Sequence, residues 1–312
     1  MNSEIESNSP LVSIVIPTFN HASFLRDAIN SIRAQTYRNW QAIVVNNFST
    51  DNTVDIITGY NDPRIRLINF HNGGIIAASR NHGIQHSTGE FVAFLDSDDL
   101  WYSQKLAACV PVLRSGIDLV CHGELWVAES ARPRKVMYGP RSHATYRNLL
   151  YRGNCISTSA TVVRRSILDQ LHGFRERYDF VTAEDYDLWL RIAHLTQRIE
   201  FIPEVLGEFR RHGGNASNAV FRNMSAELSV IGDHFSRQDR TILNKLKQRR
   251  RRGLAYYGAG RGLDAGGDHG KSIRIFLQSF ATTPFNVRLY PAILLALIHL
   301  FTSRTKNPNG DL

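Results

Sequence analysis

The stretch Phe91-Val92-Ala93-Phe94-Leu95-Asp96-Ser97-Asp98-Asp99 decides the fold, because an apolar run ends directly in a cluster of carboxylates. A short apolar run is typical of a strand that is buried on both faces of a parallel sheet. In sheets built from strand–helix–strand units, ligands bind beyond the carboxyl ends of the strands. The acidic segment therefore marks the edge of the sheet at which we expect the functional site.

An apolar run at residues 11–17 and two further predicted strands at residues 40–45 and 64–70 precede this stretch. Residues 22–35 have apolar side chains at helical spacing, and residues 75–86 are also predicted to form a helix that ends near Gly89. Alternating strands and helices predict an α/β fold, with a mainly parallel sheet flanked by helices. The ends of the earlier strands should meet beside Asp96, and they are Pro17-Thr18-Phe19-Asn20, Asn46-Asn47 and Asn72-Gly73-Gly74.

The overall composition narrows the class of protein. The 312 residues are 43% hydrophobic and 21% charged, which is ordinary for a folded chain. The formal net charge of +9 favours an acidic partner, such as a membrane surface or a phosphorylated substrate. Nucleic acid would also fit the charge, but no recognition motif accompanies it, so we expect no nucleic-acid partner. The three cysteines lack paired spacing, which favours a reducing, cytoplasmic location.

The chain divides into three predicted regions. Residues 1–10 are predicted to be flexible, residues 11–215 to form the α/β domain, and residues 216–312 to form a helical, basic extension. The basic run at residues 245–252 is either a solvated helix face or a contact with lipid or diphosphate. The apolar run at residues 289–301 has 13 residues, whereas a membrane-spanning helix needs roughly 20. That run either lies on the membrane surface or packs as an ordinary helix on the catalytic domain or on a second subunit.

The carboxylates after the fourth strand are the strongest chemical signal. Strand geometry places Asp96 and Asp98 on one face, where their charges repel unless a cation lies between them. Carboxylate oxygens favour Mg²⁺ or Mn²⁺, and these ions bind substrate phosphates. The alternative is a helix N-cap, with Asp98 or Asp99 capping a helix that runs through Leu106.

Two later segments carry weaker signals. Glu184-Asp185 begins a predicted helix, where a carboxylate can act as a general base or can simply favour the helix dipole. The run Arg210-Arg211-His212 could bind a diphosphate and a metal, or it could be a solvated turn.

The order of these segments resembles family 2 glycosyltransferases. The resemblance covers about residues 11–214, and the segments that carry it are Val12–Asn20, Ile29–Tyr37, Val44–Asp51, Asn72-Gly73-Gly74, Ala78-Ser79-Arg80-Asn81, Gly89-Glu90-Phe91, Phe94–Trp101, Glu184–Arg191 and Arg211-His212. Any one segment is weak, whereas all of them in this order are specific. The resemblance implies a GT-A fold and inversion at the anomeric carbon of the transferred sugar.

The resemblance also implies roles for particular residues. Asp98 matches the metal-binding carboxylate of the family, and His212 matches a histidine that reaches the metal or the diphosphate. Asp185 matches the catalytic base. The remaining matched or adjacent positions are expected to bind the nucleotide sugar, and they are Pro17, Thr18, Asn20, Asn47, Arg80, Asp96, Ser97, Glu184 and Arg211.

One departure from the family concerns the nucleotide base. The family commonly has two aspartates after the second strand, and here Asn46-Asn47 stand there. The second of them usually accepts a hydrogen bond from the pyrimidine ring. An asparagine carbonyl can still accept that bond, without a charge. A UDP-sugar donor therefore remains the expectation, but a different base is less strongly excluded than in relatives that keep both aspartates.

The sequence thus predicts a metal-dependent inverting glycosyltransferase with Mn²⁺ or Mg²⁺ as cofactor. The expected acceptor is a hydroxyl of a glycan or lipid-linked intermediate in the synthesis of surface polysaccharide such as lipopolysaccharide. The expected location is cytoplasmic, with peripheral contact to the inner face of the cell membrane. Two alternatives stay open, a nucleotidyltransferase and a non-catalytic protein that binds nucleotide sugars. The sugar, the linkage and the oligomeric state are not predicted.

Overall fold

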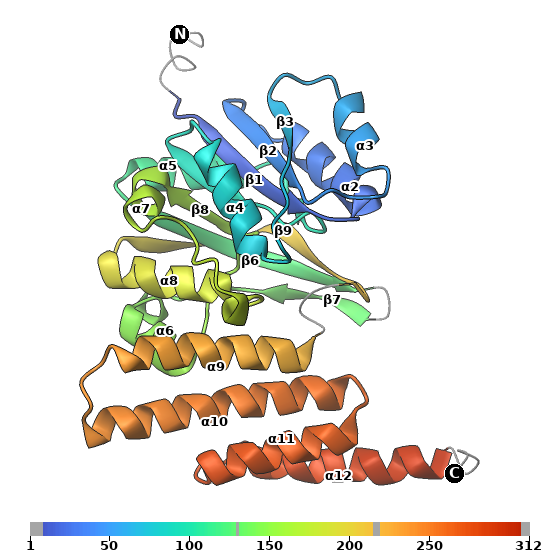
Figure 1. The fold of residues 1–312 in the computed structure, drawn as a ribbon, viewed down its shortest axis with the longest axis vertical. Coiled ribbons are helices and arrows are strands. Elements are labelled where there is room, and N and C mark those ends of the chain that lie inside the picture. Colours follow the sequence, from blue (N-terminus) through green and yellow to red (C-terminus); the bar gives the residue numbers. More distant parts are fainter. Residues whose placement is uncertain (1–8, 129–130, 215–218, 307–312) are drawn as a thin grey trace. The chain divides into compact units, whose positions relative to one another are not determined.

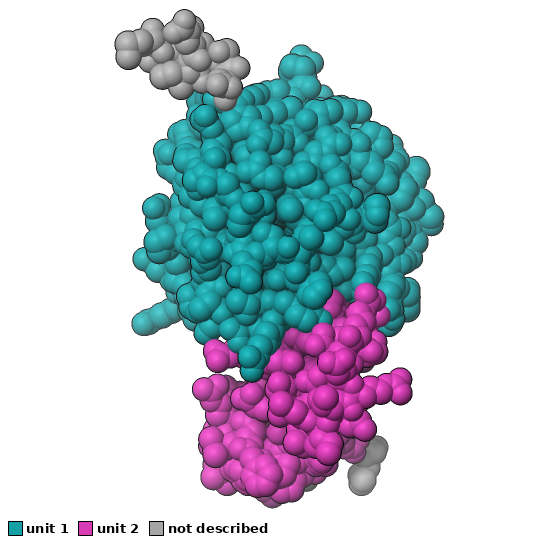
Figure 2. Space-filling view, turned by 90° about the vertical axis from the view of Figure 1, so that its left-hand side faces the viewer, with its two compact units in different colours: residues 1–149, 154–214 teal, residues 150–153, 215–312 magenta. Residues whose placement is uncertain are grey.

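The computed structural model of the chain describes residues 9–128, 131–214 and 219–306. The predicted flexible segment at residues 1–10 lies almost wholly outside the described residues. Contacts divide the chain into two compact units, residues 1–149 with 154–214 and residues 150–153 with 215–312 (Figure 2). We call them the sheet unit and the helical unit.

The first half of the sheet unit is the predicted parallel sheet (Figure 1). Strands β1 (Val12–Thr18), β2 (Trp40–Asn46), β3 (Ile65–Asn69) and β4 (Phe91–Phe94) lie at the four strands predicted from the sequence. Their spatial order is β3-β2-β1-β4, and all neighbours in this half are parallel. The carboxyl ends of these strands therefore lie at one edge.

The second half of the sheet is mixed. Strand β8 (Thr161–Arg164) is antiparallel to β4 and to β6 (Leu119–Ala128), and β6 is parallel to β9 (Ile199–Arg211). The short strand β5 (Leu100–Trp101) pairs with β9, and β7 (Ala131–Val136) pairs with β6. Because β4 leads into the acidic residues and β5 follows them, the acidic segment is tied to the sheet at both ends.

Helices cover both faces of the sheet. Helices α2 (Ala22–Arg33), α3 (Thr53–Gly59) and α5 (Lys105–Arg114) share a buried cluster with the even-numbered residues of β1 and β2. On the opposite face, α4 (Ile76–Gln85) meets Val15, and Trp189 of α8 (Glu184–Leu195) lies 6.4 Å from Phe94 between ring centroids. All seven residues of β1 are buried, as expected for a strand covered on both sides. Four shorter elements lie between these strands and helices: α6 (Tyr146–Arg152), α7 (Arg165–Gln170) and two 3-10 turns at Arg141–His143 and Tyr178–Phe180.

The alternative interpretation of the acidic residues as a helix cap is wrong. The residues after Asp99 form strand β5, and the next helix, α5, begins only at Lys105 with Gln104 as its N-cap. Asp98 and Asp99 therefore lie in a turn between two strands, because the pairing of β5 with β9 prevents an early helix start.

The helical unit contains α9 (Val220–Ser236), α10 (Ile242–Ala265), α11 (His269–Thr282) and α12 (Leu289–Lys306) (Figure 1). Helix α12 buries Leu289, Ala292 and Ala296 against Phe276 of α11, so one face of this apolar run packs within the helical unit. Its other face leaves large apolar side chains exposed. Among the described residues, no helix combines the length and the apolar content needed to cross a bilayer.

The basic run in α10 has structural contacts as well as exposed charges. Arg251 is 2% exposed and is paired with Glu227. Arg249 donates to the carbonyl oxygens of Thr282 and Ala281 at the end of α11, at 2.7 and 2.9 Å. Cations near the last carbonyl groups of a helix are favourable, so part of this run stabilises the helical unit.

Candidate active site

Asp98 and His212 meet at the carboxyl edge of the sheet. Asp98 follows β4, and His212 comes directly after β9, so the two strands bring together residues far apart in the sequence. The Nε2 atom of His212 lies 3.0 Å from Oδ2 of Asp98. The imidazole ring also stacks on Phe24 of α2, with 4.3 Å between ring centroids. This stacking holds the histidine beside the carboxylate.

Arg80 joins the acidic segment to the start of α8. Its guanidinium group donates to Oδ1 of Asp96 at 2.7 Å and to Oε1 of Glu184 at 2.6 Å. Burial alone would lower the pKa of Arg80, but the two carboxylates raise it above its ordinary value. A buried cation that is shared by two carboxylates stays charged and fixes both of them in place.

Asp185 is the residue after Glu184 and has its own set of partners. The hydroxyl of Thr158 donates to Oδ2 of Asp185 at 2.9 Å, and the backbone N–H of Tyr186 donates to Oδ1 at 2.7 Å. Burial raises the pKa of Asp185 to about 6, and the charge of Glu184 adds to this rise while Arg80 opposes it. A carboxylate with a pKa near neutrality can accept and release a proton under ordinary conditions.

Ser159 and Asp99 form a buried network that the sequence analysis missed. The Ser159 hydroxyl donates to Oδ2 of Asp99 at 2.6 Å and accepts the backbone N–H of Asp96 at 3.1 Å. Oδ1 of Asp99 accepts the backbone N–H of Arg210 at 3.1 Å. Burial, followed by repulsion from Asp98, raises the pKa of Asp99 well above its usual value. The network ties the acidic turn to β9, the strand that carries His212.

Arg210 rather than Arg211 contacts the acidic turn. The Arg210 guanidinium donates to the carbonyl oxygen of Asp98 and to Oδ2 of Asp27, the latter at 2.8 Å. Arg211 is the last residue of β9 and is exposed. Neighbouring strand residues point to opposite faces, which separates the two arginines.

The loops after β1 and β2 interlock. Oδ1 of Asn20 accepts the backbone N–H of Thr50 at 2.8 Å, and the backbone N–H of Asn47 donates to the carbonyl oxygen of Thr18 at 3.0 Å. Asn46 is buried and bonded to Asn69 and Ser49, so it has a structural role in the turn. Oδ1 of Asn47 accepts the backbone N–H of Asn72 at 3.1 Å. These loops form the part of the edge at which a nucleotide base was predicted.

The remaining predicted positions lie along the same edge or just behind it. Pro17 and Thr18 are buried at the end of β1, and Ser97 is buried with its hydroxyl 2.9 Å from Nδ1 of His21. Asp187, two residues after Asp185, is fully buried between Arg175 and Arg191. Its carboxylate therefore has a structural role, in ion pairs with these two arginines.

Thr182 is a strained residue directly before α8. Its φ of 86° lies in the left-handed region, which is unusual for a β-branched side chain. Its backbone N–H donates to Oε2 of Glu184 at 2.7 Å, which helps to hold this conformation. Backbone strain of this kind is concentrated at functional sites. Residue type alone gives no sign of it, so the sequence analysis missed this position.

Known proteins share both the sequence pattern and the fold. The family model "Glycosyl transferase family 2" matches residues 13–171. The UDP-Glc:alpha-D-GlcNAc-diphosphoundecaprenol beta-1,3-glucosyltransferase WfgD of Escherichia coli is 30% identical over 72% of this chain and 86% of its own length. The putative colanic acid biosynthesis glycosyl transferase WcaA of Escherichia coli K12 is 30% identical over 60% of this chain and 67% of its own length.

Two solved structures have the same fold. S. aureus TarS 1–349, in complex with UDP-GlcNAc, gives a TM-score of 0.63 at 17% identity, over 92% of this chain and 88% of that one. The mannosyltransferase PcManGT of Pyrobaculum calidifontis, in complex with GDP-Man and Mn²⁺, gives 0.61 at 17% identity, over 97% and 88%. The fold class is thus the predicted GT-A type. Together with the ordered motifs and the arrangement of Asp98, Arg80 and Asp185, these matches show that the chain belongs to glycosyl transferase family 2.

Proposed function

We propose that this enzyme transfers a sugar from a nucleoside diphosphate donor to a hydroxyl group of a glycan or lipid-linked acceptor, with inversion at the anomeric carbon. The observation that carries the proposal is the bridge from Arg80 to Asp96 and Glu184. This bridge joins the acidic turn to the residue beside Asp185, so the groups suited to a donor phosphate and the candidate base belong to one site.

A divalent cation fits the side chains at the acidic turn. Asp98 offers a carboxylate oxygen and His212 an imidazole nitrogen, with 3.0 Å between them. Oxygen donors suit Mg²⁺ and Mn²⁺, and an added imidazole favours a transition metal such as Mn²⁺. We propose that Asp98 and His212 hold the ion. When bound, it would stabilise the negative charge of the departing nucleoside diphosphate.

The protein residues supply the remaining chemistry. Asp185 takes the proton of the acceptor hydroxyl as its oxygen attacks the sugar on the face opposite the leaving group. Thr158 and the N–H of Tyr186 fix the orientation of the Asp185 carboxylate. A single base is sufficient for an inverting transfer, since no covalent intermediate forms. A retaining hydrolase would need a second carboxylate about 5 Å away as nucleophile.

The proposed substrates are inferred from the names of the relatives and from Asn47. WfgD is named as a UDP-Glc-dependent enzyme that acts on a diphosphoundecaprenol-linked sugar, and WcaA as a colanic acid enzyme. These names support surface polysaccharide synthesis and a lipid-linked acceptor. Asn47, in place of the usual aspartate, can still accept a hydrogen bond from uracil, so it is compatible with the UDP-sugar that the name of WfgD supports.

We also propose that residues 11–215 form the catalytic domain and that the helical extension at residues 216–312 contacts the cytoplasmic face of the membrane. Exposed apolar side chains on α12 support the contact: Tyr290, Leu294, Ile298 and Phe301 are 52%, 60%, 49% and 65% exposed. Their spacing places them on one side of the helix. Exposed Arg288 adds a cation near the start of the helix.

A donor screen tests the reaction class. The purified chain is incubated with UDP-, dTDP- and GDP-sugars, Mn²⁺ and lipid extract as acceptor source. We expect release of nucleoside diphosphate and, by NMR of the product, an inverted anomeric configuration. In a parallel incubation with nucleoside triphosphates and a sugar phosphate, release of pyrophosphate would instead identify a nucleotidyltransferase. Donor binding without turnover on any acceptor would indicate the non-catalytic alternative.

A further inference from the structure

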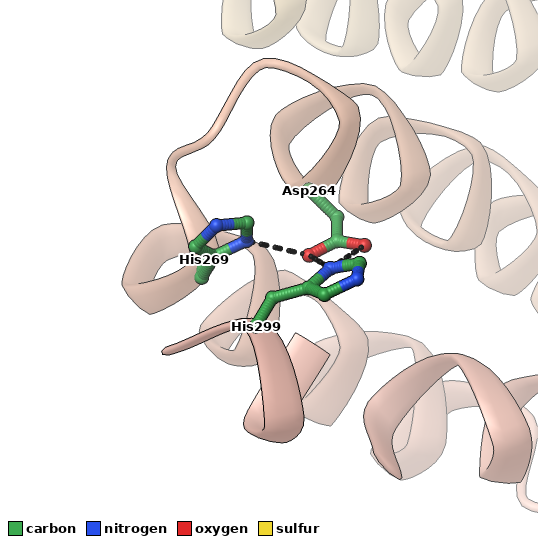
Figure 3. A group of neighbouring side chains, drawn as sticks. All are labelled: Asp264, His269 and His299. Atoms are coloured by element: carbon green, nitrogen blue, oxygen red, sulfur yellow. Dashed lines mark hydrogen bonds and ion pairs between the residues drawn. The ribbon is translucent and has the colours of Figure 1, made fainter. Parts of the chain in front are cut away.

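Three helices of the helical unit bring one carboxylate and two imidazole rings together (Figure 3). Asp264 lies near the end of α10, His269 is the first residue of α11, and His299 lies on α12. Both histidines direct Nδ1 toward the same carboxylate, at 2.8 Å for His269 and 3.3 Å for His299 (Figure 3). The candidate ligand atoms all lie within 4.8 Å of one another.

We propose that Asp264, His269 and His299 form a binding site for a zinc ion. Imidazole nitrogen and carboxylate oxygen are common zinc ligands, with bond lengths of about 2.0–2.2 Å. Around a tetrahedral ion these bonds place neighbouring ligand atoms roughly 3.3 Å apart. The 3.3 Å separations between Nδ1 of His299 and the Asp264 oxygens already match this spacing. The 2.8 Å separation between Nδ1 of His269 and Oδ1 of Asp264 would have to lengthen by about half an ångström.

The surroundings leave room for the ion and for a further ligand. A pocket of about 520 Å³ lies over the three side chains, and Arg261, Leu295 and Thr302 are among the residues that line it. The Asp264 side chain is 8% exposed and that of His299 is 39% exposed. The carboxylate is thus held inside, while the pocket admits a water molecule as the fourth ligand, as in open zinc sites.

A metal-free hydrogen-bonded cluster is the competing explanation for the same geometry. In that case each imidazole donates an Nδ1–H to the carboxylate, and no ion is needed. The architecture favours the ion, because α12 is held to α11 by a small apolar cluster in which alanines provide two of the four buried residues. Fixing His299 to Asp264, which is 35 positions earlier, would close a long stretch of chain and stabilise the three helices together.

This proposal is independent of the proposed catalytic function, because it uses none of the same residues. Its test uses the full-length chain after removal of any affinity tag and treatment with a chelator. Zinc is titrated by calorimetry, and cobalt is added to follow the visible absorption of a tetrahedral site. The same titrations are run in an Asp98→Ala background, because Asp98 and His212 could also bind zinc.

We expect one equivalent of zinc to bind in the Asp98→Ala background and to raise the thermal midpoint of unfolding by several degrees. His299→Gln and His269→Ala should each weaken zinc binding by at least about tenfold. His172→Asn, a substitution of an exposed histidine in the sheet unit, serves as the matched control and should bind zinc like the parent.

His299→Gln separates the two explanations, because glutamine can still donate a hydrogen bond to Asp264 but is a poor zinc ligand. Circular dichroism checks that the variant is folded. Absence of saturable zinc binding by the Asp98→Ala protein would overturn the proposal. So would equal zinc affinity in the parent and in the folded His299→Gln and His269→Ala variants.

Discussion

Asp185 is the residue at which the proposed chemistry can be tested most directly. We expect Asp185→Asn to reduce turnover by about two to four orders of magnitude, the usual range for loss of a general base, while donor affinity stays nearly unchanged. Turnover with saturating acceptor and donor affinity by calorimetry measure the two effects separately. Unchanged turnover would assign the base to another group. Asp187 is a poor substitute, since Arg175 and Arg191 already bind its carboxylate.

The raised pKa of Asp185 gives a second test at the same residue. The base must be ionised, so kcat/KM should fall tenfold per pH unit below about 6 and level off above it. The Thr158 hydroxyl stabilises the ionised form, so Thr158→Val should raise the pKa and move the acid limb to higher pH. Thr158→Ser keeps the hydroxyl and should leave the limb in place. A profile that is identical in all three proteins would contradict this assignment.

Asp98 is the corresponding test for the metal. We expect Asp98→Ala to abolish metal-dependent binding of the nucleotide sugar, because it removes the carboxylate paired with His212. Calorimetric titration of Mn²⁺ and donor together measures the loss. Asp55→Asn, which neutralises an exposed carboxylate in α3, is the control and should bind as the parent does. Equal binding by Asp98→Ala and the parent would remove Asp98 from the metal site.

At the scale of elements, the approach of α4 to β1 positions Arg80. A Cβ atom added at Gly83 of α4 would lie 2.4 Å from Cγ1 of Val15. We expect Gly83→Ala to lower the free energy of unfolding by about 1–3 kcal/mol, because overpacking outweighs the helix propensity gained by alanine. Lower donor affinity should follow, since a displaced α4 moves Arg80 away from Asp96.

Gly59→Ala is the matched control for this helix substitution, because nothing lies within 4 Å of the added carbon. It should stabilise the protein slightly, by up to about 1 kcal/mol. Chemical denaturation measures both variants. The double variant Val15→Ala with Gly83→Ala should recover donor affinity, because it removes the overpacked methyl group. Equal stability of Gly83→Ala and the Gly59→Ala control would contradict the predicted overpacking between α4 and β1.

At the scale of the whole molecule, the proposed membrane contact depends on the exposed side of α12. The combined variant Leu294→Gln, Ile298→Gln and Phe301→Gln should reduce binding to anionic vesicles by at least about a hundredfold, since each buried large apolar side chain contributes about 1.5–3 kcal/mol. Sedimentation with phosphatidylglycerol vesicles measures this. Met137→Gln with Tyr178→Gln removes exposed apolar groups from the sheet unit and should have little effect.

Cell fractionation extends the same test. The native enzyme should associate with membranes and be at least partly released by high salt followed by carbonate, because basic residues near an anionic surface contribute about 1 kcal/mol each. Truncation before Asn286 removes α12 and should leave the enzyme in the supernatant. Equal distribution of the truncated and native chains would decide against the contact.

Local patterns in the sequence were sufficient for the parallel half of the sheet. Strands β1, β2, β3 and β4 each lie within two residues of a predicted strand. Strands β1, β2 and β4 are almost wholly buried, and burial on both faces requires continuous apolar side chains. Strand β3 is only partly buried and includes the polar residues Arg66 and Asn69. The acidic cluster after β4 and the helix start at Glu184 were also predicted from local sequence patterns. Both follow from side chains that are close neighbours in the chain, so their chemistry is visible without the fold.

The tertiary structure alone decided which distant side chains meet. The Ser159 hydroxyl holds Asp99 because β8 pairs with β4, and Arg210 reaches the acidic turn because β9 pairs with β5 in one register. Likewise, His299 meets Asp264 only where α12 packs in the helical unit. These contacts depend on long-range pairing, which composition and spacing within a short window do not encode.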